Sequence, residues 1–152
     1  MEVIGRSKTG LKAKVITGGL LKEYKGVNIP EAKLEFGSIS SRDIQDISFC
    51  KEHGFDYIAQ SFVRTRQDIL EIRKILGADA RCRVIAKIEN LEGINNIDEI
   101  ISASDGIMIA RGDMGVSLPV YQVPVIQKMI IKKCNSAGKF AVSYTHLTLP
   151  TN

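Results

Sequence analysis

The sequence predicts an α/β protein in which parallel strands alternate with helices, preceded by a short all-β segment. Two observations favour this fold class. From residue 40 onward, segments with helical apolar spacing alternate with near-continuous apolar runs, at intervals of roughly 20 to 35 residues, which indicates parallel βα units with right-handed crossovers. Before residue 30, apolar and basic residues alternate between glycine turns, which is typical of antiparallel strands with one wet face.

The first thirty residues illustrate that second pattern. Leu11 and Ala13 alternate with Lys12 and Lys14, and the glycine pair of "TGG" follows. We therefore expect short antiparallel strands here. Pro30 and the irregular "EAKLEFGS" predict a linker, because the helical rhythm begins only afterwards.

The helices are predicted from apolar stripes that end at glycine. In "SISSRDIQDISFCKEHG", Ser40 and Asp43 fit a capping box, and Gly54 can take the left-handed position that ends a helix. "QDILEIRKILG" carries an apolar stripe closed by Gly77. Two further helices are expected around "NNIDEIISAS" and in "QVPVIQKMIIKKCNSAG", where the proline falls in the first turn.

The strands between these helices are expected in "DYIAQSFV", "VIAKIE", "GIMIAR" and "KFAV". An open doubly wound sheet and a (β/α)₈ barrel both fit this order. The sequence contains neither G-x-G-x-x-G nor G-x-x-x-x-G-K-[ST], so a Rossmann or P-loop fold would lack its phosphate-binding turn. Barrel enzymes instead place their chemistry at the carboxyl ends of strands.

Composition excludes several other classes. The 152 residues are 44% hydrophobic and 25% charged, as is ordinary for a globular domain, and no apolar run is long enough to cross a membrane. We expect a cytoplasmic protein with no membrane partner. Cys50, Cys82 and Cys134 lack the spacing of a zinc site or disulfide framework. The net charge of +4 resides in residues 1–30 without interleaved aromatics, so we expect no nucleic-acid partner.

Charged residues at the end of "VIAKIEN" indicate a functional site. Lys87 and Glu89 are two residues apart on a strand, so their side chains project from one face, roughly 6.6 Å apart at the usual rise per residue. They can converge on one small charged ligand. The alternative is a surface salt bridge, which contributes only about 0–1 kcal/mol.

The next predicted strand ends in the same way, in "ARGDMGV". Gly112 and Gly115 permit a tight turn around Asp113. If the two strands are neighbours, Glu89 and Asp113 can share a divalent cation, since two carboxylates plus water and substrate oxygens suit Mg²⁺. The triplet Arg111-Gly112-Asp113 also occurs in cell-adhesion ligands, but it ends a buried-looking strand and we expect no secretory signal, so we do not expect an adhesion role.

Two strings carry a resemblance to a known family. "VIAKIENLEGINNIDEIISASDGIMIARGDMGV", followed by "VPVIQKMIIKKCNSAGK", closely resembles pyruvate kinase, and "LKAKVITGGLLKEYKGVNIP" is similar to the end of that family's small β domain. The resemblance covers residues 10–139. It implies that residues 1–30 end a small β domain and that residues 31–139 form central βα units of a (β/α)₈ barrel, with about half of its strands.

The resemblance also implies a function, phosphoryl transfer from phosphoenolpyruvate to ADP, giving pyruvate and ATP in glycolysis. Glu89 and Asp113 would hold Mg²⁺ or Mn²⁺, Lys87 would stabilise the phosphoryl group in transfer, and the backbone at Gly112 and Asp113 would bind the substrate carboxylate. The family also uses K⁺, whose ligands we expect outside this chain. The full-length family is expected to form homotetramers.

The carboxyl end departs from the family pattern. After "GK" the family typically continues P-V-I-T-A-T-Q-M-L, whereas this chain reads "FAVSYTHLTLPTN". We expect residues 140–152 to be a divergent, non-native tail. Thr145 falls in register with the threonine that helps to protonate the enolate, but its neighbours do not match, so that role is not assigned to it.

A chain with about half a barrel is expected to be inactive alone. Two alternatives stay open: a divalent-metal-dependent aldolase or lyase acting on pyruvate-like oxoacids, and a non-catalytic structural segment. The lysine two residues before Glu89 and the small β segment before the barrel units favour the kinase.

Overall fold

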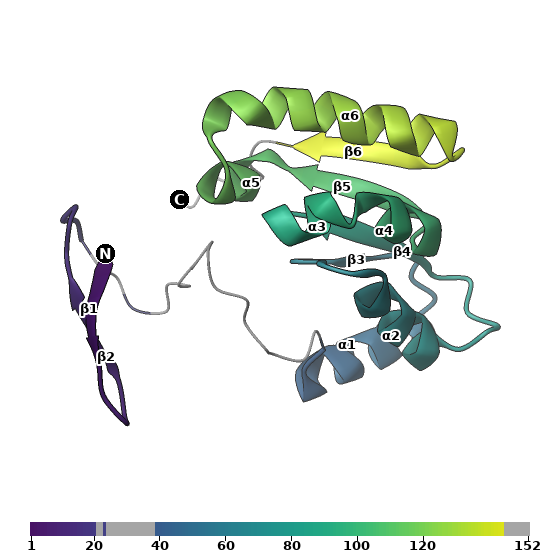
Figure 1. Ribbon diagram of the computed structural model, residues 1–152. Helices are drawn as coiled ribbons and strands as arrows, with labels where there is room; N and C mark the ends of the chain where they lie inside the picture. Colours follow the sequence, from purple (N-terminus) through teal and green to yellow (C-terminus); the bar gives the residue numbers. More distant parts are fainter. Residues whose placement is uncertain (21–22, 24–38, 145–152) are drawn as a thin grey trace, which may run out of the picture.

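The computed structural model describes residues 1–20, 23 and 39–144 (Figure 1). The predicted linker after Pro30, the boundary expected at residues 30 and 31, and Thr145 lie outside these ranges. Two sheets are present in the described part, one of two strands and one of four.

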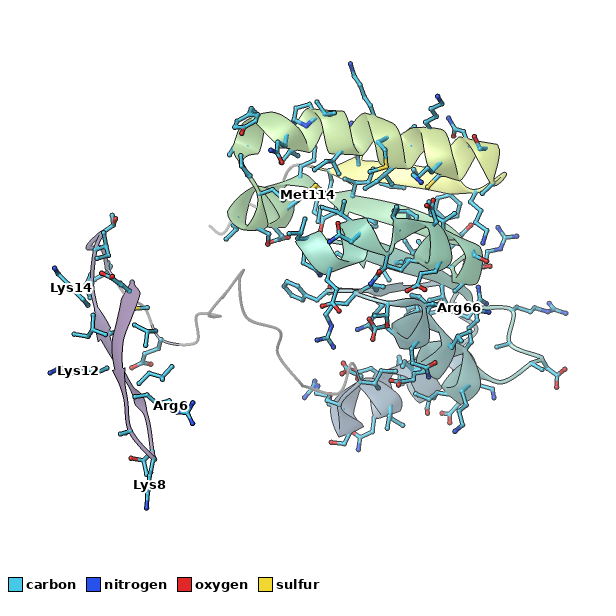
Figure 2. All side chains as sticks on the ribbon, in the orientation of Figure 1. Arg6, Lys8, Lys12, Lys14, Arg66 and Met114 are labelled. Carbon is cyan, nitrogen blue, oxygen red and sulfur yellow. The ribbon has the colours of Figure 1, made fainter. Side chains whose placement is uncertain are left out.

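The amino-terminal residues form an antiparallel hairpin, as the alternation predicts. Strand β1 (Glu2–Arg6) pairs with β2 (Leu11–Lys14), and the amide of Ser7 donates to the carbonyl of Gly10 at 2.9 Å in the turn. The basic side chains project into solvent (Figure 2). The alternation also predicts that one face of this hairpin is buried. In the described part neither face is buried, and Leu11, for example, is 65% exposed, because no second layer covers the hairpin there.

The second sheet has four parallel strands in the order of the sequence. They are β3 (Tyr57–Gln60), β4 (Arg83–Ile88), β5 (Gly106–Ala110) and β6 (Phe140–Tyr144), each hydrogen-bonded to the next. The helices lie on one side of this sheet (Figure 1). A doubly wound sheet would carry helices on both sides and reverse its strand order. The fold is therefore part of a (β/α)₈ barrel, with half of its strands.

The helices have the following bounds: α1 (Ser41–Glu52), α2 (Arg66–Leu76), α3 (Leu91–Asn95), α4 (Ile97–Ala103), α5 (Arg111–Ser117), the short 3₁₀ helix η1 (Val120–Gln122) and α6 (Val123–Ser136). Helix α3 has no counterpart among the predicted elements. It occupies a single turn after β4, too short for an apolar stripe to reveal it.

The predicted helix ends are confirmed. Ser40 caps α1, and its side chain and that of Asp43 satisfy each other's backbone amides in a capping box. These hydrogen bonds from Ser40 hold the pKa of Asp43 below 3.8. Three glycines that follow helices have the left-handed backbone expected there, with φ of 67° at Gly54, 80° at Gly77 and 66° at Gly138.

The apolar core lies between the sheet and its helices. Alternate residues of β4, namely Val84, Ala86 and Ile88, are fully buried against the apolar stripes of the helices. The residues between them project from the opposite face of the sheet. That alternation places Lys87 and Glu89 on the inner face, toward the axis of a barrel.

The amino ends of the strands are held by a polar cluster. Asp105, at the start of β5, accepts from the amide of Val84 at 2.7 Å and pairs with the Arg73 guanidinium of α2 at 2.8 Å. The Lys139 ammonium donates to the carbonyl of Ser102 at 2.9 Å and to two neighbouring carbonyls at the end of α4. These contacts join α2 to β4 and β5, and join the end of α4 to the residue before β6, at the end opposite the candidate site.

Candidate active site at the carboxyl ends of the strands

The predicted site residues come from the carboxyl ends of two neighbouring strands. Lys87 lies in β4 opposite Met108 of β5, and Glu89 directly follows β4. Gly112 and Asp113 lie in the first turn of α5, which begins at the residue after β5. Because β4 and β5 are hydrogen-bonded and parallel, both groups emerge at the same edge of the sheet.

Lys87 and Glu89 form an ion pair. The ammonium nitrogen of Lys87 lies 2.8 Å from Oε1 of Glu89, and the Glu89 side chain is only 2% exposed while that of Lys87 is 20% exposed. The salt bridge considered above therefore forms, but it does not lie at the surface, because the Glu89 carboxylate is removed from water. A buried carboxylate requires compensation by charge and hydrogen bonds.

The second oxygen of Glu89 is bound by the backbone after β3. The amide of Phe62 donates to Oε2 at 2.7 Å, and the hydroxyl of Ser61 accepts from the Lys87 ammonium at 2.8 Å. Phe62 is the one non-glycine residue of the described part with a left-handed backbone, at φ 55°. The predicted strand "DYIAQSFV" therefore ends at Gln60, because the chain turns sharply at Phe62.

Neither Ser61 nor Phe62 is identified by the sequence pattern. A left-handed turn is usually marked by glycine or asparagine, and this turn has neither. The apolar Phe62 and Val63 extend the strand pattern instead. The available signal was Ser61, a serine near the end of the predicted strand, but one serine is too common to single out.

The environment of Lys87 keeps its side chain charged. Partial burial acts to lower the pKa of Lys87, but the hydrogen bond and charge of Glu89, with a smaller contribution from Tyr144, raise that pKa above 10.5. The Tyr144 ring centre lies 5.9 Å from the ammonium. At neutral pH the site therefore presents a fixed positive charge beside a buried carboxylate.

The segment after β5 is helical where a glycine turn was expected. Arg111 to Ser117 form α5, and neither Gly112 nor Gly115 has a positive φ. The prediction of a tight turn is therefore wrong. Ala110, with φ −87° and ψ 84°, leads the strand straight into the helix, and Met114 anchors that helix by complete burial (Figure 2).

Asp113 is the available carboxylate of the site. It is half-buried, and within residues 1–20, 23 and 39–144 it has no hydrogen-bond or ion-pair partner. Nearby, Nε of Arg111 is buried and likewise has no hydrogen-bond partner in the described part. Glu89 is thus satisfied by protein groups, whereas Asp113 is free to accept a ligand.

The donor set fits Mg²⁺ better than a metal held by the protein alone. Within the described ranges, no group of three or more His, Cys, Asp or Glu side chains is placed to hold a metal ion. Mg²⁺ is commonly bound by one or two carboxylates, with water and substrate oxygens completing its shell. Glu89 and Asp113, which follow adjacent strands, are the residues that could supply such a pair.

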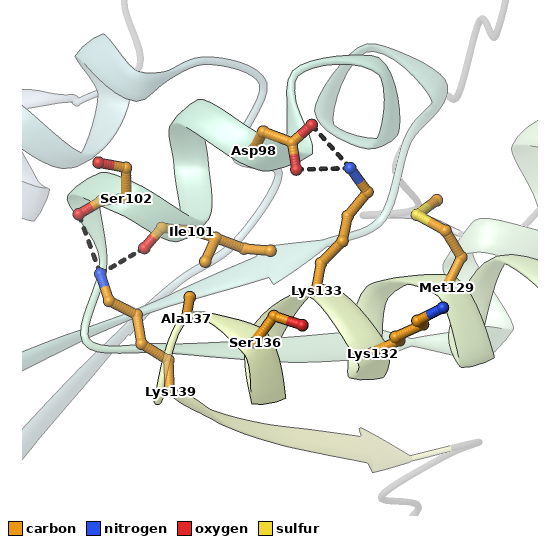
Figure 3. Close-up of a pocket in the computed structure, with 9 residues that line it drawn as sticks. All are labelled: Asp98, Ile101, Ser102, Met129, Lys132, Lys133, Ser136, Ala137 and Lys139. Carbon is orange, nitrogen blue, oxygen red and sulfur yellow. Dashed lines mark hydrogen bonds and ion pairs between the residues drawn. The ribbon is translucent and has the colours of Figure 1, made fainter.

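A hollow in the described part of the chain lies away from the candidate site. A pocket of about 810 Å³ opens between α4 and α6, lined by residues that include Asp98, Lys133 and Lys139 (Figure 3). Lys133 and Asp98 pair across it at 2.6 Å. None of its lining residues is a candidate site residue. The size of a hollow is therefore a poor guide to the chemistry of this chain.

No helix of the described part has both the length and the apolar character needed to cross a membrane.

Comparison with known proteins gives a consistent result. A family model described as "Pyruvate kinase, barrel domain" matches residues 1–149. The chain is 52% identical to a pyruvate kinase from Geobacillus stearothermophilus over 135 residues, which is 88% of this chain and 23% of that protein. It is 45% identical to one from Clostridium perfringens over 141 residues, which is 91% of this chain and 30% of that protein. The chain thus spans between 23% and 30% of these two relatives.

Proposed function

The chain belongs to the pyruvate kinase family, and from that premise we propose that it carries the metal and phosphoryl-transfer cluster of an enzyme that moves a phosphoryl group from phosphoenolpyruvate to ADP. The observation that supports this most strongly is the pairing of Lys87 with the buried Glu89 at 2.8 Å, at the end of the strand next to the one that Asp113 follows. Cytoplasmic glycolysis, K⁺ dependence and a homotetramer of the longer protein are part of the same proposal.

In this proposal four residues share the tasks of the site. Glu89 and Asp113 hold the divalent cation, which when bound supplies positive charge to the phosphoryl and carboxylate oxygens. Lys87 places its ammonium where the negative charge of the phosphoryl group is greatest during transfer. The amides of Gly112 and Asp113 orient the substrate carboxylate. Such catalysis consists of positioning and charge neutralisation, which a fixed lysine can provide.

Burial strengthens these electrostatic effects. Interactions between charges increase as the surrounding dielectric constant falls, so a carboxylate that is 2% exposed interacts with a cation more strongly than one in water. The amide of Phe62 also fixes the direction in which Glu89 presents its oxygens. Glu89, at the end of β4, is therefore a carboxylate held in a fixed orientation, and Asp113, which follows β5, is the second proposed ligand of the cation.

The test is a titration with Mn²⁺ followed by electron paramagnetic resonance. We expect one Mn²⁺ site, weakened at least tenfold by Glu89→Gln and by Asp113→Asn, and strengthened by phosphoenolpyruvate. Asp46→Asn is the matched control, since Asp46 is exposed on α1, and it should leave the affinity unchanged.

Two results would count against this function. Unchanged Mn²⁺ affinity in both site variants would mean that the proposed site does not operate and would favour a structural segment. Tightening of Mn²⁺ binding by pyruvate but not by phosphoenolpyruvate would favour the aldolase or lyase alternative.

A further inference from the structure

We propose that the Ser61–Phe62 turn is the positioning element of this site, and that Ser61 holds the Lys87 ammonium in place when a divalent cation occupies Glu89. The presence of a divalent cation in this inference rests on the proposed function, whereas the contacts of Ser61 and Phe62 do not depend on it. Both residues lie in the turn after β3, and each contacts one member of the ion pair.

Phe62 fixes the carboxylate through its backbone. A left-handed backbone at a bulky residue is strained, and such strain persists where surrounding contacts impose it, often at functional sites. Here the strained conformation directs the Phe62 amide at Oε2 of Glu89, 2.7 Å away. The Phe62 side chain is 61% exposed, so burial of the ring does not explain why the turn adopts this shape.

Ser61 offers Lys87 a partner of a different kind from Glu89. The ammonium lies 2.8 Å from both the Ser61 hydroxyl and Oε1 of Glu89. A divalent cation on Glu89 competes for Oε1 and repels the ammonium through its like charge. The neutral hydroxyl of Ser61 is not claimed by the cation in this way.

The position of Ser61 is set by the sheet. Gln60, its neighbour, pairs in register with Ala86 of β4, the residue before Lys87. The Ser61 hydroxyl therefore stays beside Lys87 regardless of what Glu89 binds. The structure thus assigns two anchors to Lys87, a charged one that the metal displaces and a neutral one that remains.

The experiment measures how firmly the Lys87 ammonium is held, by nitrogen-15 relaxation of its N–H bonds in the full chain. Without Mg²⁺, the Lys87 side chain should be equally ordered in the native chain and in Ser61→Ala, because Glu89 holds the lysine. With saturating Mg²⁺, Lys87 should stay ordered in the native chain, whereas in Ser61→Ala it should become as mobile as the exposed Lys128. Ser61→Thr, which keeps the hydroxyl, should stay rigid in both conditions.

A metal-free arm separates this inference from the proposed function. In a Glu89→Met background, which removes the charged anchor, Lys87 should remain ordered when Ser61 is present and become mobile when Ser61→Ala is added. If saturating Mg²⁺ leaves Lys87 ordered in Ser61→Ala, the metal does not displace the lysine from Glu89, while this arm still decides the role of Ser61. If Lys87 stays rigid in Ser61→Ala with Mg²⁺ and in the double variant, the inference is overturned.

Discussion

Replacing Lys87 by methionine is expected to lower the free energy of unfolding by about 3 kcal/mol at neutral pH, because it strands a buried carboxylate. Glu89 would keep the amide of Phe62 but lose the ammonium at 2.8 Å. Methionine has a similar length and is apolar, so little packing is lost. Urea denaturation of both chains measures the difference.

The stability difference between the native chain and Lys87→Met should also depend on pH, in a direction that can be measured. The pKa of Lys87 is raised in the fold, so the stability that its charge contributes is fully present below 10.5 and is lost as pH rises through the folded value. The native chain should therefore lose its advantage over Lys87→Met above about pH 10.5. Lys128→Met, at an exposed position of α6, is the control and should change stability by less than about 0.5 kcal/mol. An equal loss in both variants would contradict the account.

Alanine at position 93 is the second substitution with a large expected effect. A β-carbon on Gly93 would lie 2.5 Å from the carbonyl oxygen of Val63, which is closer than such atoms approach. Helix α3 or the turn after β3 must then move, and the hydrogen bond from the Gly93 amide to the Asn90 side chain, now 2.8 Å, is disturbed. We expect a loss of about 1–3 kcal/mol.

The substitution should also alter the candidate site, because the residues displaced, Asn90 and Val63, directly follow Glu89 and Phe62 in the chain. Mn²⁺ affinity is therefore expected to fall in Gly93→Ala. Gly115→Ala is the matched control, since its β-carbon would make only an ordinary contact at 3.9 Å with Val120, and alanine is the better helix residue in α5. The account is wrong if Gly93→Ala is as stable as Gly115→Ala.

Periodicity and end signals were sufficient to predict most of the barrel segment. Ile69, Ile72 and Leu76 are all buried in α2 as their spacing indicates, and the glycines after α1, α2 and α6 have the expected left-handed backbone. These features are local, since each depends on residues within one or two turns. Ile44, which shares the apolar stripe of α1, is nevertheless 45% exposed, because burial also depends on neighbouring elements.

The details of the site depended on contacts that the local sequence does not encode. The pairing of Lys87 and Glu89 follows from strand alternation, but Ser61 and Phe62 reach this pair from 26 and 27 residues away in the chain. Their role depends on the register of β3 against β4 and on one left-handed residue without glycine. Likewise, a helix replaces the expected turn at Gly112 because Met114 is buried against the core, a tertiary effect that outweighs the usual preference of glycine.

The central claim is that Glu89 and Asp113 hold one divalent cation beside Lys87. The most direct measurement is anomalous diffraction from a crystal of the chain soaked with Mn²⁺. We expect a single anomalous peak that lies about 2.1 Å from a carboxylate oxygen of each residue, the distance typical of Mg²⁺. A peak that contacts only one of the two carboxylates, or neither, would contradict it.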